Sequence, residues 1–371
     1  MDARNVELAQ QLISYSVELK PGEKVYIEVK GTDALDLGRA LVKAATEAGG
    51  VPFWYYNDED ISRHFVLNAG EEQFKAWGEF HRRIMQDVDA YIAVRGSNNT
   101  FDHSDASDER QQWFAKAYWE RVHSVRVKEK KWCVLRYPNP AMALLAQEAT
   151  EPFADFYYKV CTLDYARMST AMDPLVELMQ GTDRVDIKGP GTDISFSIRG
   201  IGAVKCDGKR NIPDGEVYSC PVRDSANGVI TYNAGTLYSG ALFRDLRFEV
   251  KNGRIEKASC MGDQNKLERI LDTDEGARYF GEFAIGLNPY ITKPMLDILF
   301  DEKIDGSFHL TPGQAYDTTD NGNKSAVHWD IVSIQTKEWG GGEIYFDGRL
   351  VRKDGRFVVP ELLGLNPENL A

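Results

Sequence analysis

The chain has 371 residues, of which 43% are hydrophobic, and its 57 acidic and 44 basic side chains give a formal net charge of -13. This length exceeds one ordinary hydrophobic core and predicts two domains. The acidic balance repels phosphate backbones and anionic lipid surfaces, so we expect neither a nucleic-acid nor a membrane partner.

The N-terminal sequence and the cysteines predict a cytoplasmic protein. The first twenty residues carry acidic and amide side chains throughout, unlike the basic and apolar regions of a signal peptide. No stretch approaches the roughly 18 apolar residues that a membrane span needs. An odd number of widely spaced cysteines is typical of reduced thiols rather than of a disulfide framework; they are Cys133, Cys161, Cys206, Cys220 and Cys260.

The first half of the chain alternates short β-branched or aromatic runs with longer amphipathic runs. This alternation is typical of a parallel sheet covered by helices. The pattern predicts strands at 24–29, 51–56, 90–95 and 132–137, and helices near 35–45, 71–86 and 108–129. Residues 1–183 are therefore expected to form an α/β domain with a largely parallel sheet.

From about residue 184 the pattern changes to strands separated by tight turns. Three dipeptides that favour two-residue hairpins follow strand-like runs, namely Asn252-Gly253, Asp347-Gly348 and Asp354-Gly355. We therefore predict a β-rich α+β domain over residues 184–371, with the boundary near residue 183.

Two of the six histidines, His309 and His328, lie in strand-like segments of the second half. Residues i and i+2 of a strand point to the same side, so His328 and Asp330 are expected to present an imidazole and a carboxylate together. This pair alone fits a metal site and a simple hydrogen-bonded pair about equally well. The other histidines lie among charged residues of helical segments and are expected at the surface; they are His64, His81, His103 and His123.

Two glutamates stand in unusual contexts. Glu216 follows a Pro-Asp-Gly turn that would hold the next side chain in place. Glu282 interrupts an otherwise apolar segment, where a buried carboxylate would cost several kcal/mol without a partner. That partner is either a metal ion or an arginine or lysine from elsewhere in the chain.

The order and spacing of these residues resemble the signature of the thermophilic-type metallo-aminopeptidases, the aminopeptidase T family. The resemblance covers nearly the whole chain and includes the opening helix followed by Lys20-Pro21-Gly22-Glu23-Lys24-Val25. The segments that carry it in the second half are 212–217, 281–286, 301–303, 306–309, 313–316 and 328–330.

The resemblance implies a metal-dependent aminopeptidase that removes N-terminal residues from short peptides. It implies that the β-rich domain holds two divalent ions through Glu216, Glu282, His309, His328 and Asp330, and that the protein is a cytoplasmic homodimer. Oxygen and imidazole ligands without thiolate suit catalytic Zn, Co or Mn, and two such ions would activate a water molecule.

Two further residues are candidates for catalysis. The resemblance puts Tyr316 at or beside the metal site, where it would donate a hydrogen bond to the oxyanion, ligate a metal or pack the wall of the site. Glu302 is a candidate proton carrier, although an Asp-Glu-Lys sequence is ordinarily a solvated turn. Cys220 is expected to be a buried thiol.

Two rival functions remain open from the sequence. Hard oxygen ligands also suit a two-metal phosphoesterase, which the acidic composition disfavours. A two-domain protein could instead bind a peptide without turnover.

Overall fold

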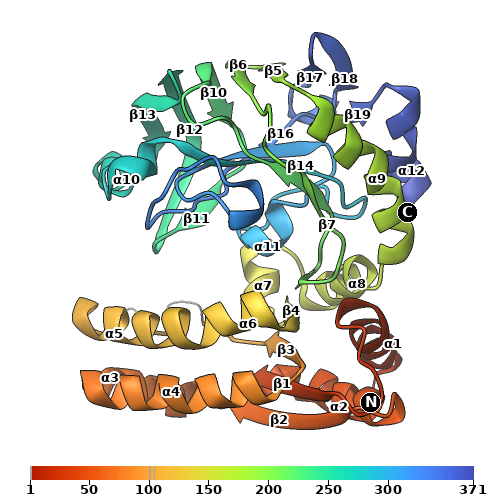
Figure 1. The fold of residues 1–371 in the computed structure, drawn as a ribbon, viewed down its shortest axis with the longest axis vertical. Coiled ribbons are helices and arrows are strands. Elements are labelled where there is room, and N and C mark those ends of the chain that lie inside the picture. The colour runs from red at the N-terminus through yellow and green to blue at the C-terminus, as the bar shows by residue number, and fades with distance from the viewer. Residues whose placement is uncertain (1, 100–101, 104) are drawn as a thin grey trace. The chain divides into compact units, whose positions relative to one another are not determined.

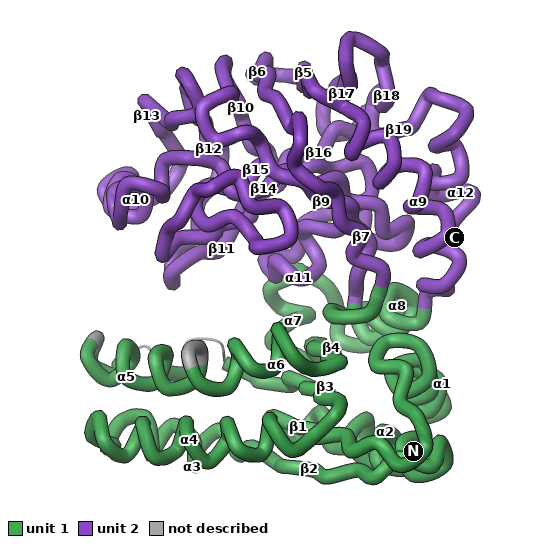
Figure 2. The backbone as a smooth tube through the Cα atoms, viewed as in Figure 1, with its two compact units in different colours: residues 1–162, 208–212 green, residues 163–207, 213–371 purple. Residues whose placement is uncertain are grey.

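The computed structural model describes residues 2–99, 102–103 and 105–371. These residues form two units that are distinct in their internal contacts (Figure 2): one consists of residues 1–162 and 208–212, the other of residues 163–207 and 213–371. Among the described residues, no helix is both long enough and apolar enough to cross a lipid bilayer.

The structural division lies about twenty residues before the boundary expected near residue 183. Helix α9 (Tyr165–Gly181) packs against strands β7 (Val204–Cys206) and β9 (Glu216–Ser219), so it belongs to the second unit. The change to a hairpin-rich sequence marks the first strand of that unit, which follows this helix. Residues 208–212 return to the first unit, where β8 (Asn211–Ile212) joins its sheet.

The first unit contains the predicted α/β fold with a parallel sheet (Figure 1). Its strand order is β2-β1-β3-β4-β8, and every neighbouring pair is parallel. The four main strands lie within a residue or so of the predicted runs; they are β1 (Lys24–Lys30), β2 (Val51–Asn57), β3 (Ala90–Arg95) and β4 (Lys131–Arg136).

Helices surround this parallel sheet and bury its central strands. Strand β3 is buried along most of its length, as expected for a strand covered on both faces. On one face Tyr26, Tyr91 and Val134 form a core with Met85 and Val122. The helices are α1 (Ala3–Gln11), α2 (Leu35–Glu47), α3 (Glu59–Asn68), α4 (Glu71–Asp87), α5 (Asp108–Tyr118), α6 (Ser124–Glu129), α7 (Pro140–Leu145) and α8 (Thr150–Cys161).

The second unit is β-rich, as predicted, and contains two antiparallel sheets. In the larger sheet the order is β11-β12-β10-β6-β5-β17-β18-β19, with β13 paired to β12. Its strands are β5 (Arg184–Gly189), β6 (Thr192–Ser197), β10 (Asn227–Tyr232), β11 (Thr236–Tyr238), β12 (Ala241–Lys251), β13 (Arg254–Met261), β17 (Glu343–Phe346), β18 (Arg349–Lys353) and β19 (Arg356–Phe357).

The three predicted hairpin turns connect neighbouring strands of the larger sheet. Asn252-Gly253 joins β12 to β13, Asp347-Gly348 joins β17 to β18, and Asp354-Gly355 joins β18 to β19. All six residues have positive φ, between 49° and 78°, which matches the turn type that these dipeptides favour.

The smaller sheet has the order β16-β15-β14-β9-β7 and is also antiparallel. It packs on the larger sheet, since Phe196 of β6 contacts Phe283 edge-to-face at 5.0 Å and the Tyr232 hydroxyl donates to the Leu310 carbonyl at 2.8 Å. Its remaining strands are β14 (Phe280–Gly286), β15 (Ser307–Pro312) and β16 (Val332–Ile334), and the helices of this unit besides α9 are α10 (Gln264–Leu271), α11 (Ile298–Asp301) and α12 (Pro367–Leu370).

Candidate metal centre

Three neighbouring strands of the smaller sheet bring three of the predicted ligands together. Glu282 lies on the central strand β14, His309 lies opposite Ala284 on β15, and Glu216 lies opposite Gly286 on β9. Since residues 282, 284 and 286 point to the same side of the strand, their partners face the same space. Glu216, Glu282 and His309 are all at most 5% exposed.

All five predicted metal ligands lie within one cluster. Glu282 Oε1 is 3.2 Å from His309 Nε2, and its other oxygen is 3.3 Å from His328 Nε2. Glu216 Oε2 lies 3.7 Å from His309 Nε2, and Asp330 Oδ1 lies 3.3 Å from His328 Nε2.

The cluster consists of two groups of three ligand atoms that share Glu282. One group is Glu216, Glu282 and His309, the other is Glu282, His328 and Asp330, and within each group the atoms lie within 4.8 Å of one another. An ion bound about 2.0 to 2.2 Å from each oxygen or nitrogen would fit between such atoms.

Contacts with the backbone and a hydroxyl fix the ligands of the second group. An isolated antiparallel bridge joins His328 to Gly313, and His328 Nδ1 donates to the Gln314 carbonyl at 2.8 Å. This bond leaves Nε2 directed at Glu282, a common arrangement for metal-binding histidines. Thr311 Oγ1 donates to Asp330 Oδ1 at 2.7 Å.

Three buried side-chain atoms of the cluster residues have no hydrogen-bond partner among the described residues. His309 Nδ1 faces away from the carboxylates, whereas Glu216 Oε2 and His328 Nε2 are ligand atoms, one in each group. Buried polar atoms without a partner are rare, because desolvation costs about 1–3 kcal/mol. Both atoms are of the kind that binds divalent metals, so this donor set fits a pair of metal ions.

The charges of the cluster shift its pKa values strongly. Burial opposes ionisation of His309, but Glu282 and Glu216 outweigh it and raise the pKa of His309 to about 9. Burial also lowers the pKa of His328, but Asp330 and Glu282 outweigh burial and raise this pKa well above its ordinary value. Burial raises the pKa of Glu282, but the imidazoles of His309 and His328, 3.2 and 3.3 Å from its oxygens, outweigh burial and lower it.

Asp301 and Lys303 are buried and Glu302 is half-buried, so the interpretation of this segment as a solvated turn was wrong. Lys303 is 1% exposed; its ammonium lies 3.1 Å from Glu216 Oε1 and also contacts Glu302. Burial raises the pKa of the Glu302 carboxyl to about 8; the Lys303 charge opposes this shift and the Glu216 charge adds to it. Glu302 therefore titrates near neutrality, as suits a proton carrier.

Tyr316 lies beside the second group of ligands. Its ring centre is 4.7 Å from that of His328 and 5.6 Å from that of Tyr218. Although 45% of the residue is exposed, local desolvation of the hydroxyl and the charges of Glu282 and Asp330 raise its pKa well above the ordinary value. The phenol therefore remains a neutral hydrogen-bond donor.

Several residues around the cluster were not predicted. Asp214 lies 3.8 Å from the Lys303 ammonium and groups with Cys206 and Glu216. The apolar residues around positions 301–303, from Ile298 to Ile304, were the only sequence signal that these charges are buried.

The remaining cysteine and histidine expectations are met in part. Cys220 is buried as expected, with its thiol directed at the carbonyls of Pro221 and Phe280. Of the other four histidines only His64 is exposed; His81, His103 and His123 are half-buried.

A family model described as thermophilic metalloprotease (M29) matches residues 2–357 of the chain. The chain belongs to this family. Within it, aminopeptidase T of Thermus thermophilus is 27% identical over 97% of this chain and 100% of its own length. Aminopeptidase 2 of Geobacillus stearothermophilus is 24% identical over 94% of each chain.

Two solved structures share the architecture of this M29 member. AmpT from Thermus thermophilus has a TM-score of 0.81 at 24% identity and covers 96% of this chain and 100% of its own. 2,5-Dihydroxypyridine dioxygenase from Pseudomonas putida KT2440 has a TM-score of 0.63 at 13% identity, with coverages of 97% and 99%. These likenesses concern the fold, which here is associated with two reactions.

The comparisons confirm the predicted family and the predicted two-part fold. Membership of a metalloprotease family also confirms a metal-dependent hydrolase of peptide bonds, and the curated relatives are aminopeptidases. The phosphoesterase and the non-catalytic peptide-binding protein are accordingly disfavoured.

The Gly313→Ala substitution should damage the second ligand group. Gly313 has a φ of +107°, and a Cβ there would lie 2.0 Å from the Val327 carbonyl oxygen, so the segment that holds His328 must move. We expect a loss of more than about 1 kcal/mol in unfolding free energy and a lower metal content, measured by urea titration and elemental analysis.

Gly322→Ala is the matched control, because Gly322 has a φ of +83° but no atom within 4 Å of the added Cβ. The Gly322→Ala variant has the backbone strain of a positive φ without a steric clash, so it should retain its metal. Equal metal loss in both variants would show that Gly313 has no special part in placing His328.

Proposed function

We propose that this chain is a two-metal aminopeptidase that removes N-terminal residues from short peptides. The observation that carries the proposal is Glu282, whose two carboxylate oxygens each face a different imidazole, at 3.2 and 3.3 Å. One bridging carboxylate with an imidazole and a second carboxylate on each side is a suitable frame for two divalent ions. The names of the relatives support the choice of reaction.

Each proposed ion has its own ligands besides Glu282. Glu216 and His309 would hold one ion, and His328 and Asp330 would hold the other, since these side chains form the two groups that share Glu282. The three carboxylates contribute about -3 against about +4 from two divalent ions, so positive charge remains at the centre. Zn, Co and Mn are the candidate metals, because the donor set is oxygen and imidazole without thiolate.

When bound, such ions lower the pKa of water and polarise the scissile carbonyl. Glu302 takes up the proton released by the attacking water and returns it to the leaving amine. Tyr316 donates its O–H to the negative charge that develops on the substrate carbonyl oxygen. The free α-amine of the substrate is held beside the cluster carboxylates, which restricts cleavage to the N-terminus.

We further propose a cytoplasmic homodimer. The five cysteines are free thiols, which suits a reducing compartment. The edge strand β2 exposes Phe53 and Trp54, at 45% and 67%, and exposed apolar edge strands commonly pair with another chain. Sedimentation at several protein concentrations tests the assembly.

A chelator should abolish hydrolysis of leucine p-nitroanilide, and added Zn, Co or Mn should restore it, because the reaction depends on bound cations. The N-acetylated substrate should not be cleaved, since it lacks the free amine. p-Nitrophenyl phosphate should remain intact under the same conditions. Metal-restored phosphatase activity without peptidase activity would favour the phosphoesterase instead, and peptide binding without turnover in metal-loaded protein would favour a binding protein.

Glu282→Ala should reduce kcat/KM by about a hundredfold or more, because it removes a ligand of both ions. Mutation of a residue that only hydrogen-bonds to a metal ligand already lowers metal affinity or activity about 10–100-fold. His64→Ala is the matched control: His64 is exposed, and this substitution should leave the rate within about twofold of the parent. Circular dichroism of both variants checks the fold. A Glu282→Ala variant as active as His64→Ala would refute the proposed centre.

A further inference from the structure

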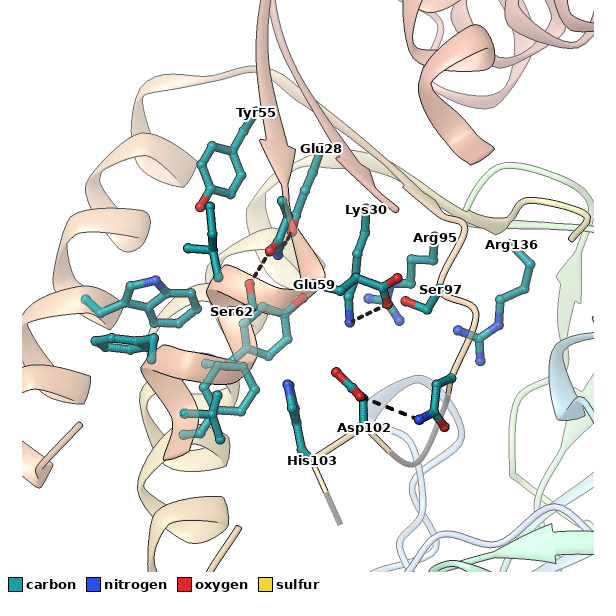
Figure 3. A pocket seen from close by; sticks show the side chains of 18 residues that line it. Glu28, Lys30, Tyr55, Glu59, Ser62, Arg95, Ser97, Asp102, His103 and Arg136 are labelled. Carbon is teal, nitrogen blue, oxygen red and sulfur yellow. Dashed lines mark hydrogen bonds and ion pairs between the residues drawn. The ribbon is translucent and has the colours of Figure 1, made fainter. Parts of the chain in front are cut away.

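The first unit contains a cavity of about 610 Å³ that the proposed peptidase reaction does not use. Every residue that lines it belongs to this unit, and Figure 3 shows it at close range. Its volume falls within the usual range of small-molecule sites. It opens at the carboxyl ends of the parallel strands, the edge at which open α/β sheets commonly bind ligands.

A row of polar strand ends forms one side of the cavity. Asn57, Lys30, Arg95 and Arg136 are the last residues of β2, β1, β3 and β4, and the pairing places Lys30 opposite both Asn57 and Arg95, and Arg95 opposite Arg136. With strands about 4.8 Å apart, the three cations span roughly 10 Å. In Figure 3 their side chains follow one another across the view, with Arg95 and Ser97 between Lys30 and Arg136.

The basic row lies at the end of an apolar face of the sheet. Tyr91 and Ala93 precede Arg95 at two-residue steps on the same side of β3, and both belong to a buried apolar cluster. The hydrophobic face of the sheet therefore ends abruptly in positive charge. Arg95 is half-buried at this position, and an anion beside it would offset the cost of desolvating its charge.

Arg95 has no carboxylate within 4.0 Å among the described residues. Its guanidinium has five N–H donors. Burial lowers the pKa of Arg95, but the nearby Tyr118, Tyr91 and Glu28 outweigh burial and raise it. Lys30 forms one long ion pair, of 4.0 Å, with the Glu59 carboxylate. Arg95 thus retains N–H donors that can bind an anion, with Lys30 beside it.

The acidic side chains of the cavity already have partners. Glu28 accepts from the Tyr91 hydroxyl at 2.5 Å and from the Asn57 amide at 3.3 Å. Asp102 accepts from the Asn99 amide at 3.5 Å. Both carboxylates keep their negative charge in these contacts, and that of Glu28 acts on Arg95 through space. Neither forms an ion pair with Arg95 within 4.0 Å in the part of the chain that the structure describes.

Aromatic side chains form another wall of the cavity. Trp77 lies with its ring centre 5.5 Å from that of Phe114 and 6.3 Å from that of Phe65, and Phe114 stacks on Tyr118 at 6.4 Å. A planar ring can pack against such a wall, whereas an inorganic anion could not use it.

We propose that this cavity binds a small aromatic anion, with its acidic group on Arg95, Arg136 and Lys30 and its ring against Phe65, Trp77 and Phe114. The acidic group is a carboxylate or a phosphate; if the ligand also carries an amine, Glu59 and Asp102 are the groups that would receive it. This site is independent of the metal centre, because it shares no residue with it.

Calorimetric titration of the metal-loaded full chain tests the site with phenylacetate, phenyl phosphate and L-phenylalanine as probes. At least one should bind with a Kd below about 1 mM, and the tightest identifies the carboxylate, the phosphate or the zwitterion as the preferred group. Benzyl alcohol should bind at least about tenfold more weakly, since it lacks the charge. The same Kd should persist in excess chelator; its loss there would place the probe on the metal ions and overturn the proposal.

Arg95→Gln should weaken the tightest probe about tenfold or more, because charge-assisted hydrogen bonds to the guanidinium are lost. The matched control Arg83→Gln removes a 74% exposed arginine of the same unit and should leave the Kd unchanged. Unaltered binding in Arg95→Gln, or no binding of any probe to the parent protein, would overturn the site. If Arg95→Gln proves unstable, crystals of the parent soaked with p-bromophenylacetate decide: an anomalous bromine peak in the cavity supports the site, and its absence refutes it.

Discussion

Three carboxylates gather around one point, two of them buried and one half-buried, and the second unit depends on how their charge is compensated. Glu216, Glu282 and Asp330 would repel one another and lose hydration if nothing compensated them. Lys303 supplies one positive charge, but it is shared with Glu302 and Asp214. Without metal ions the remaining compensation comes from protons on His309 and His328, whose pKa values are raised accordingly. Divalent ions would displace these protons and satisfy the same charges, because metal-binding imidazoles are neutral.

The fold meets this constraint by placing the ligands on paired strands. Hydrogen-bonded neighbours β9, β14 and β15 fix Glu216, Glu282 and His309, so the first ligand group is set by the register of the sheet. The second group depends instead on the close approach of Gly313 to the segment that carries His328. Since a dioxygenase shares this fold, the reaction must be specified by the ligands and their surroundings rather than by the architecture.

The sequence was sufficient for the parts of the structure that follow periodic or local rules. The parallel strands, the three hairpin turns and the convergence of His328 with Asp330 were predictable from alternation, turn chemistry and two-residue spacing. Even so, Asp330 lies outside any strand, and only His328 forms an isolated bridge. The gathering of all five ligands was expected from the family resemblance, since no local rule relates Glu216 to His309.

What the sequence did not reveal depends on tertiary contacts. Lys303 and Glu302 have the composition of an exposed turn, and only the packing of the surrounding chain buries them. The basic row at the ends of β1, β3 and β4 is scattered over more than a hundred residues and becomes visible only once the parallel register is known.

Anomalous diffraction from crystals grown with Zn or Co tests the metal centre most directly. Two peaks should appear about 3.5 to 4 Å apart, one bounded by Glu216 and His309 and the other by His328 and Asp330, with Glu282 between them. Ions bound elsewhere, or an empty cluster in protein that hydrolyses peptides, would contradict the account.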